Sequence, residues 1–175
     1  MSLLVLFGLV ISIFGFAFLR TRLKASRLSR LSWDDLVGRL KPVPFSGIST
    51  IAVDYLQPSK GQIGIETNEL WAMIGGLEGL QSMYANAEIL IALAGYAQRW
   101  NLDESVIVAE RMRRDGIKLR RATSKLSMSF LVGFGVHGPF HVQEAASAYY
   151  LMRRRLLALY ETSHVGRYSR LAAAL

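Results

Sequence analysis

The amino-acid sequence predicts an all-α protein, with a single N-terminal transmembrane helix followed by a small cytoplasmic helical bundle. Three observations lead to this prediction. An uncharged apolar run stands near the N-terminus, a basic cluster follows it directly, and apolar residues recur at helical spacing in the later part of the chain. The 175 residues are enough for one modest domain in addition to an anchor.

The composition excludes several classes of protein. Apolar residues make up 51% of the chain, which is too many for a largely disordered protein. The formal net charge of +8 at pH 7 favours an anionic partner, which is a nucleic acid, an anionic membrane surface or an acidic protein. The absence of cysteine excludes disulfides, zinc–thiolate sites, iron–sulfur clusters and thiol catalysis.

The segment Ser2–Leu19 is predicted to cross a membrane. It holds 18 residues without a charge, and a helix of that length spans about 27 Å, close to the hydrocarbon thickness of a bilayer. A cleaved signal peptide is the weaker alternative, because no basic side chain precedes the run. A buried core helix is also less favoured, because a basic cluster follows at once: Arg20, Arg22, Lys24, Arg27 and Arg30.

This cluster sets the expected orientation. Because Lys and Arg remain on the cytoplasmic side, we expect a short N-terminus outside and the body of the chain in the cytoplasm, as an integral, single-pass membrane protein. Arg20, Arg22, Lys24 and Arg27 are candidate contacts with anionic lipid head groups or with a partner. The alternative, that they only set the topology, remains open.

The body is expected to begin with a short helix and a linker. Ser32 is a suitable N-cap, and the helix is expected to end near Arg39. Pro42, Pro44 and Gly47 predict a loop, whereas residues 51–56 are left open between a strand, a helical turn and coil. The predicted organisation is an anchor at 1–20, a basic juxtamembrane segment at 21–31, a short helix and loop-rich linker at 32–66, a helical bundle at 67–165 and a tail at 166–175.

The segment from Thr67 to Trp100 contains no proline and is predicted to be helical, with Thr67 as its N-cap. Gly75, Gly76 and Gly79 weaken it, so one kinked helix and two separate helices are both compatible with the sequence. Residues 89–97 are almost wholly apolar and are expected to form the most buried part of the bundle.

A helix from about 103 to 131 has the clearest periodicity in the chain. Its expected core seam alternates spacings of four and three: Ser105, Ala109, Met112, Gly116, Leu119, Thr123, Leu126 and Phe130. A basic row with the same spacing lies nearly opposite this seam: Arg111, Arg114, Lys118, Arg121 and Lys125. Residues 111–125 carry seven positive charges and one acid, Asp115.

A second long helix is expected from about 140 to 161. Its seam also alternates three and four: Val142, Ala145, Tyr149, Met152, Leu156 and Leu159. Arg153–Arg155 are expected to face mostly away from this seam, and the tail is either frayed or a short terminal helix.

The basic row has three interpretations. It is a solvated face or one that meets an acidic partner, it lies against the anionic inner leaflet, or it binds nucleic acid. The last is the least favoured, because neither a recognisable nucleic-acid motif nor interleaved aromatic residues accompany the row.

The stretch 131–142 contains the spacing G-x-G-x-x-G. A dinucleotide site requires a strand before these glycines, and here a heptad helix is predicted instead. We therefore interpret Gly133, Gly135 and Gly138 as a turn between two helices. A re-entrant membrane segment at 126–142 is also disfavoured, because irregular backbone is not tolerated in lipid.

A carboxylate and histidine site is the chemical alternative. Glu161 and His164 have the E-x-x-H spacing of di-iron bundles, but the chain lacks a second copy of this motif. Glu88 stands in an apolar run and is expected to pair with an arginine of the basic helix. The candidate metal ligands are Glu88, Glu110, His141, Glu144, Glu161 and His164.

These observations favour a non-enzymatic scaffold, accessory subunit or interaction module at a membrane. The expected partner is another protein or a second copy, bound through the Ala109–Gly116–Leu119 or the Tyr149–Met152–Leu156 seam if packing within the chain does not use these seams fully. A membrane-bound helical metalloenzyme is the alternative function, and nucleic-acid binding is the third. Neither a cofactor nor a small-molecule substrate is inferred from the sequence.

Overall fold

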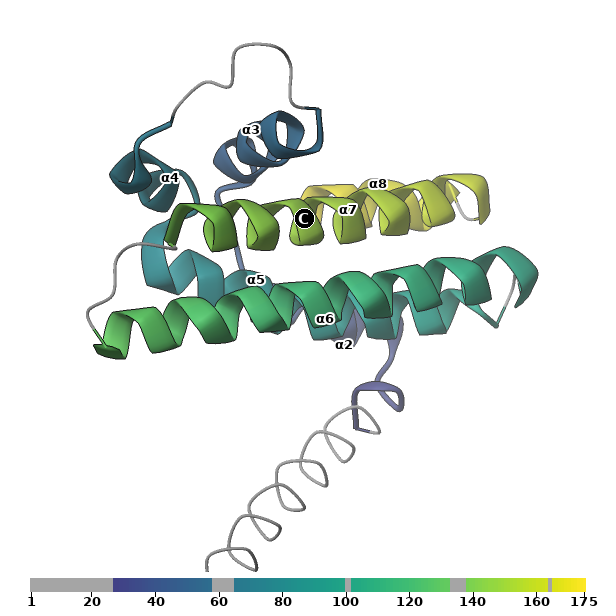
Figure 1. Ribbon diagram of the computed structural model, residues 1–175. Helices are drawn as coiled ribbons and strands as arrows, with labels where there is room; N and C mark the ends of the chain where they lie inside the picture. Colours follow the sequence, from purple (N-terminus) through teal and green to yellow (C-terminus); the bar gives the residue numbers. More distant parts are fainter. Residues whose placement is uncertain (1–26, 58–64, 100–101, 133–137, 164) are drawn as a thin grey trace, which may run out of the picture.

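The computed structural model describes residues 27–57, 65–99, 102–132, 138–163 and 165–175, and these residues confirm an all-α fold because none of them is in a strand (Figure 1). The helices are α2 (Trp33–Val37), α3 (Phe45–Leu56), α4 (Thr67–Met73), α5 (Gly76–Ala97), α6 (Leu102–Val132), α7 (Gly138–Ser163) and α8 (Val165–Ala174). None of the helices in these ranges is long and apolar enough to cross a membrane. The anchor predicted at Ser2–Leu19 lies outside the described residues.

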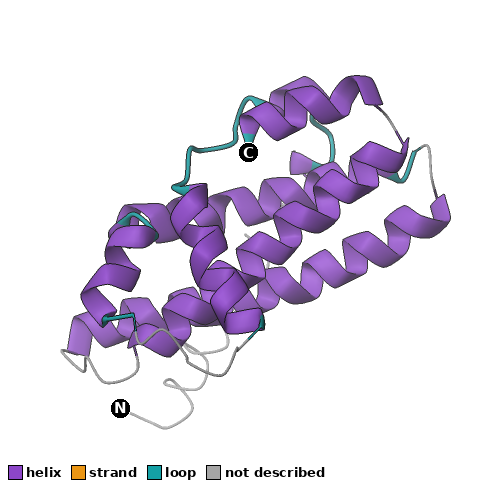
Figure 2. Cartoon of the chain, turned by 90° about the horizontal axis from the view of Figure 1, so that it is seen from above, coloured by secondary structure: helices purple, strands orange, loops and turns teal. Residues whose placement is uncertain are grey.

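Helix α7 lies at the centre of the bundle. It packs against α6 and α5 on one side and against α3, α4 and α8 on the others. Seen from above in Figure 2, the long helices run side by side. Helix α2 packs against α5, and α5 in turn packs against α6, so α5 separates the first described helix from α6.

The two predicted seams form the core of the bundle. All six seam residues of α7 are buried, and so are Ser105, Ala109, Met112, Leu119 and Leu126 of α6. A Cβ at Gly116 would contact both Ile91 of α5 and Met152 of α7, so the α6 seam lies between these two helices. The buried seam residues are therefore occupied by packing inside the chain and are not free to bind a partner.

The predicted start of α2 is confirmed. Ser32 Oγ accepts a hydrogen bond from the Asp35 backbone N–H at 3.1 Å, and Asp35 Oδ2 accepts one from the Ser32 N–H at 3.4 Å. This capping box satisfies two backbone donors at the helix start. The inner side of the short helix buries Trp33 and Leu36.

The predicted loop after Pro42 is wrong from residue 45 onward. Helix α3 begins at Phe45, directly after Pro44, and it includes residues 51–56, which the sequence left open. Ile48, Ile51 and Ala52 share its buried face. Gly47 is part of this helix rather than of a turn, and glycine is required there because a Cβ would collide with the carbonyl oxygen of Met73 in α4.

The glycines at 75 and 76 divide the next segment into two helices. Both have positive φ, +77° at Gly75 and +63° at Gly76, which favours glycine. The expected cap at Thr67 is not formed, because Glu66 occupies the N-cap position and Thr67 is the first residue of α4. Gly79 allows close approach of the chain, since a Cβ there would collide with the carbonyl oxygen of Ile74.

The C-terminal tail is a helix, α8, that joins the core through the buried Leu171. It also lies against α2. Arg170 pairs with Asp34 at 2.6 Å, and its guanidinium carbon is 5.1 Å from the ring centroid of Trp33. Buried residues from every helix, α2 to α8, belong to one hydrophobic cluster.

Candidate interaction surface on α6

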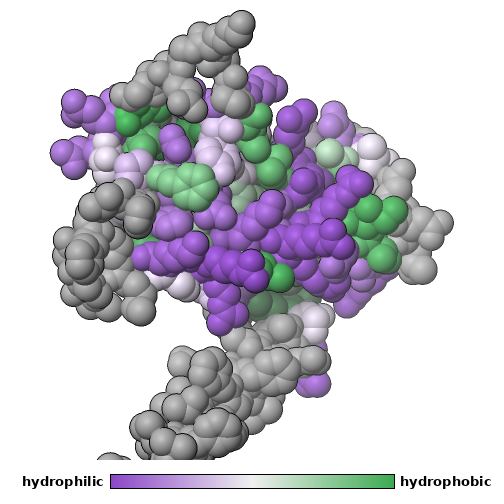
Figure 3. All heavy atoms as spheres, viewed as in Figure 1, coloured by the Kyte–Doolittle hydropathy of each residue, from purple (hydrophilic) through white to green (hydrophobic). Residues whose placement is uncertain are grey.

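The outward side of α6 carries a dense set of cations, here named the basic face of α6. In Figure 3 a hydrophilic band runs along this helix, with small hydrophobic patches inside it. All five cations predicted from the sequence are exposed, and Arg113 and Arg120 lie on the same side. The basic face consists of Arg111, Arg113, Arg114, Lys118, Arg120, Arg121 and Lys125.

The acid in this stretch, Asp115, points inward and is 4% exposed. It forms an ion pair with Arg155 of α7. Burial lowers the pKa of Arg155, and the nearby Arg111 lowers it further. Of Arg153–Arg155, which were expected to face mostly away from the α7 seam, Arg154 is exposed, whereas Arg155 faces α6. Because Asp115 is withdrawn from the surface, it does not offset the seven exposed cations.

Glu110 is the carboxylate at the N-terminal end of the basic face. Its side chain lies 3.5 Å from Arg113 and 3.6 Å from Arg114, one helical turn further along α6. Such exposed pairs are weak, contributing about 0.5 kcal/mol or less each. Among the residues that the structure describes, no carboxylate pairs with Lys118, Arg121 or Lys125.

Three exposed apolar side chains lie on the same side of α6 as the cations, one among them and two in the turn before them. Val106 is 47% exposed, Ile107 is 56% exposed and Ile117 is 50% exposed. Isolated apolar residues are common on surfaces. Here they lie on the same helix face as the basic residues, so a partner that neutralises the cations also covers apolar area.

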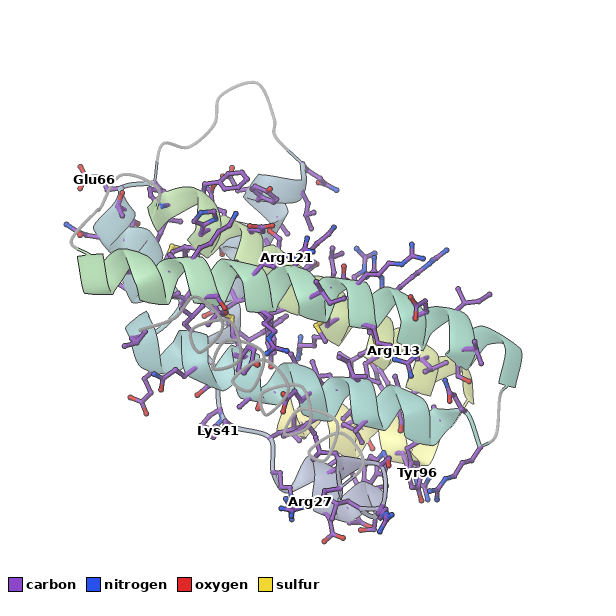
Figure 4. All side chains as sticks on the ribbon, turned by 60° about the horizontal axis from the view of Figure 1, so that its bottom comes forward. Arg27, Lys41, Glu66, Tyr96, Arg113 and Arg121 are labelled. Atoms are coloured by element: carbon purple, nitrogen blue, oxygen red, sulfur yellow. The ribbon has the colours of Figure 1, made fainter. Side chains whose placement is uncertain are left out.

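The basic residues predicted near the anchor lie elsewhere on the molecule. Arg27 is exposed at the start of the described chain, before α2, whereas Arg20, Arg22 and Lys24 lie outside the described residues. Figure 4 shows Arg27 on the opposite side of α5 from Arg113 and Arg121. The predicted contact residues that the structure describes therefore fall into two separate areas.

The candidate metal ligands do not converge. His141 Nδ1 lies 3.5 Å from Glu144 Oε2 in the first turns of α7. Glu110 and Glu161 are exposed on α6 and α7, and Glu88 is half-buried on α5. His164 lies outside the described residues. Within the described part of the chain, no group of three or more potential ligands is arranged around a common point.

The glycine-rich stretch follows α6, and α7 begins at Gly138. The segment before the glycines is a helix, as the interpretation of a turn requires, and not the strand of a dinucleotide site. Residues 133–137, with Gly133, Gly135 and His137, lie outside the described residues.

A second polar site, which was not predicted from the sequence, consists of the hydrogen bonds made by the Asn86 side chain. Its side chain accepts from the Lys41 N–H at 2.8 Å and donates to the Lys41 carbonyl at 2.7 Å. It also donates to the Tyr149 hydroxyl at 3.2 Å, which ties α5 to α7. A cavity of about 400 Å³ lies beside it, lined by Lys41, Pro42, Pro44, Gly75, Glu78, Gly79, Gln81 and Ser82.

The chain was compared with protein-family models, with curated proteins and with solved structures, and none of them matches it.

Proposed function

We propose that this protein is a membrane-anchored, non-enzymatic interaction module or accessory subunit that holds an anionic partner on the basic face of α6. The observation that carries this proposal is the separation of charge on α6. Seven cations are exposed, whereas Asp115 is buried against Arg155. A surface that concentrates one sign of charge attracts and orients a partner of the opposite sign.

The anchor in this proposal is the uncharged run Ser2–Leu19, with its N-terminus outside the membrane and the helical body in the cytoplasm. Its support is the length of the run and the five basic residues that follow it. An anchored body encounters partners in the plane of the membrane, which raises their effective concentration.

The decisive experiment compares two double variants of the full chain, purified from native membranes in mild detergent. Lys118→Glu with Arg121→Glu reverses two cations that have no partner among the described residues. Because each reversal removes an attraction and adds a repulsion, we expect the amount of co-purifying partner to fall about tenfold. The measurement is the stoichiometry of the partner at low and at raised salt.

The matched control is Arg39→Glu with Lys41→Glu, which makes the same change of charge at one arginine and one lysine that are exposed after α2. We expect this variant to retain the partner. Equal loss from both variants would show a dependence on net charge alone and would contradict the assignment to α6. A chain that co-purifies with one or two metal ions per molecule, and without a protein partner, would favour the metalloenzyme instead.

A further inference from the structure

The outer face of α6 repeats every seven residues, as the buried seam does. Residues spaced seven apart form a row along the helix. Two rows of the outer face begin with an apolar residue and continue with arginine, and a third row is basic throughout. The fourth row contains Ile117. These rows are Val106–Arg113–Arg120, Ile107–Arg114–Arg121, Arg111–Lys118–Lys125 and Glu110–Ile117–Ser124.

A seven-residue repeat is the pattern that lets one helix pack lengthwise along another, as in a coiled coil. Residues seven apart on a straight helix drift by only about 20°, so each row still faces the same neighbour after two heptads. The inner rows of α6 use this property to pack on α5 and α7. The outer rows have the same period, are exposed, and have no helix packed on them among the described residues.

The arrangement of charge favours a protein helix over a lipid surface. At about 100° per residue, Arg114 and Arg121 lie near the middle of the exposed arc, with Lys118 to one side and Arg113 to the other. A helix that lies in a bilayer interface instead has an apolar centre with cations at its edges. The face also lies across α5 from Arg27, the first described residue after the predicted anchor.

The chemistry of the cations indicates what the partner presents. Five of the seven are arginines, whose planar guanidinium groups donate two parallel hydrogen bonds to a carboxylate. Ile117 lies among them and Ile107 lies one turn before them, and both offer apolar area to a facing side chain. The complementary surface therefore carries carboxylates at a seven-residue period with occasional apolar residues.

We infer that the partner of this face is an acidic α-helix of another protein, which lies along α6 over about two heptads. The inference rests on the proposed function, because it names the partner of the same basic face. The cationic stretch from Arg111 to Lys125 is about 21 Å long at 1.5 Å per residue, which sets the length of the contact.

The test uses two synthetic peptides of identical composition, rich in glutamate, alanine and leucine. One has glutamates and leucines at a seven-residue period on one face, and the other has the same residues in scrambled order. Binding of each to the full chain in detergent is measured by fluorescence anisotropy. We expect the periodic peptide to bind about tenfold more tightly, since several weak charge pairs act together only when its glutamates share one face.

Lys118→Glu with Arg121→Glu should abolish this preference, and Arg39→Glu with Lys41→Glu should leave it unchanged. Equal affinity for the two peptides would overturn the inference but not the proposed function, because the face would then be a general polyanion site. Binding to phosphatidylserine vesicles but to neither peptide would assign the face to lipid. A dimer that dissociates in the α6 variant would assign it to a second copy of the chain.

Discussion

Asp115 determines the character of α6, because its position decides whether the helix presents a mixed or a uniformly basic surface. Its carboxylate is withdrawn from water and is paired with Arg155, which is itself 29% exposed at the side chain. A buried carboxylate without a partner is costly. The ion pair with α7 is therefore what allows the acid to remain inside the bundle.

Removal of Arg155 should destabilise the protein. We expect Arg155→Leu to lower the free energy of unfolding by about 3 kcal/mol, because it leaves the Asp115 carboxylate buried and unpaired. The double variant Asp115→Leu with Arg155→Leu should recover most of this loss. Denaturant unfolding of the full chain in mild detergent measures both values. An unchanged midpoint in the single variant would show that the pair contributes nothing to stability.

Sequence reasoning found the exposed cations but not their buried neighbour. The five predicted cations follow from the geometry of a helix, because their row lies opposite an apolar seam. Asp115 has no such signal, since its partner Arg155 lies in another helix and only packing brings the two together. The same holds for Asn86. An amide in the middle of an apolar helix indicates a buried polar contact, but the sequence does not identify its partner, because the backbone of Lys41 lies 45 residues away.

At the scale of elements, two of the glycines in α5, Gly79 and Gly95, differ in whether a side chain would fit at their position. A Cβ at Gly79 would collide with the Ile74 carbonyl oxygen, whereas a Cβ at Gly95 meets nothing within 4 Å. Both glycines lie within the helix, so both pay the same intrinsic cost of glycine in a helix. Any difference in stability between the alanine variants at these two positions therefore measures the effect of packing.

We expect Gly79→Ala to destabilise the protein by about 2 kcal/mol, because the preceding turn must shift to accommodate the methyl group. Gly95→Ala should stabilise it by about 1 kcal/mol, since alanine restricts the unfolded chain and favours the helix. Thermal or denaturant unfolding of the two variants measures the contrast. Equal effects of the same sign would show that the close approach at Gly79 has no energetic consequence.

The helices were predicted correctly where an apolar periodicity extended over several turns. Helices α6 and α7 match the predicted helices to within about two residues, the usual uncertainty of helix ends. Helix α3 was missed because Pro42, Pro44 and Gly47 resemble a loop. Proline is tolerated immediately before a helix, and Gly47 is required by a contact with α4 that is not local.

At the scale of the whole molecule, the untested prediction is the membrane anchor. We expect the full chain to remain in the membrane fraction after an alkaline carbonate wash, because an apolar helix of 18 residues partitions into lipid. A chain that lacks residues 2–19 is the control and should be released. Release of the full chain would contradict the anchor, and digestion of the body by protease added outside intact cells would contradict its orientation.

The contact between α2 and α8 has a consequence for synthesis. Trp33 packs against Tyr160, and Asp34 pairs with Arg170, which lies 136 residues later in the chain. At the usual pace of translation this interval takes roughly ten seconds. Until then α2 can pack on α5, but Asp34 and the ring of Trp33 lack their contact with Arg170. The N-terminal helix of this body therefore reaches its final packing only after α8 has left the ribosome.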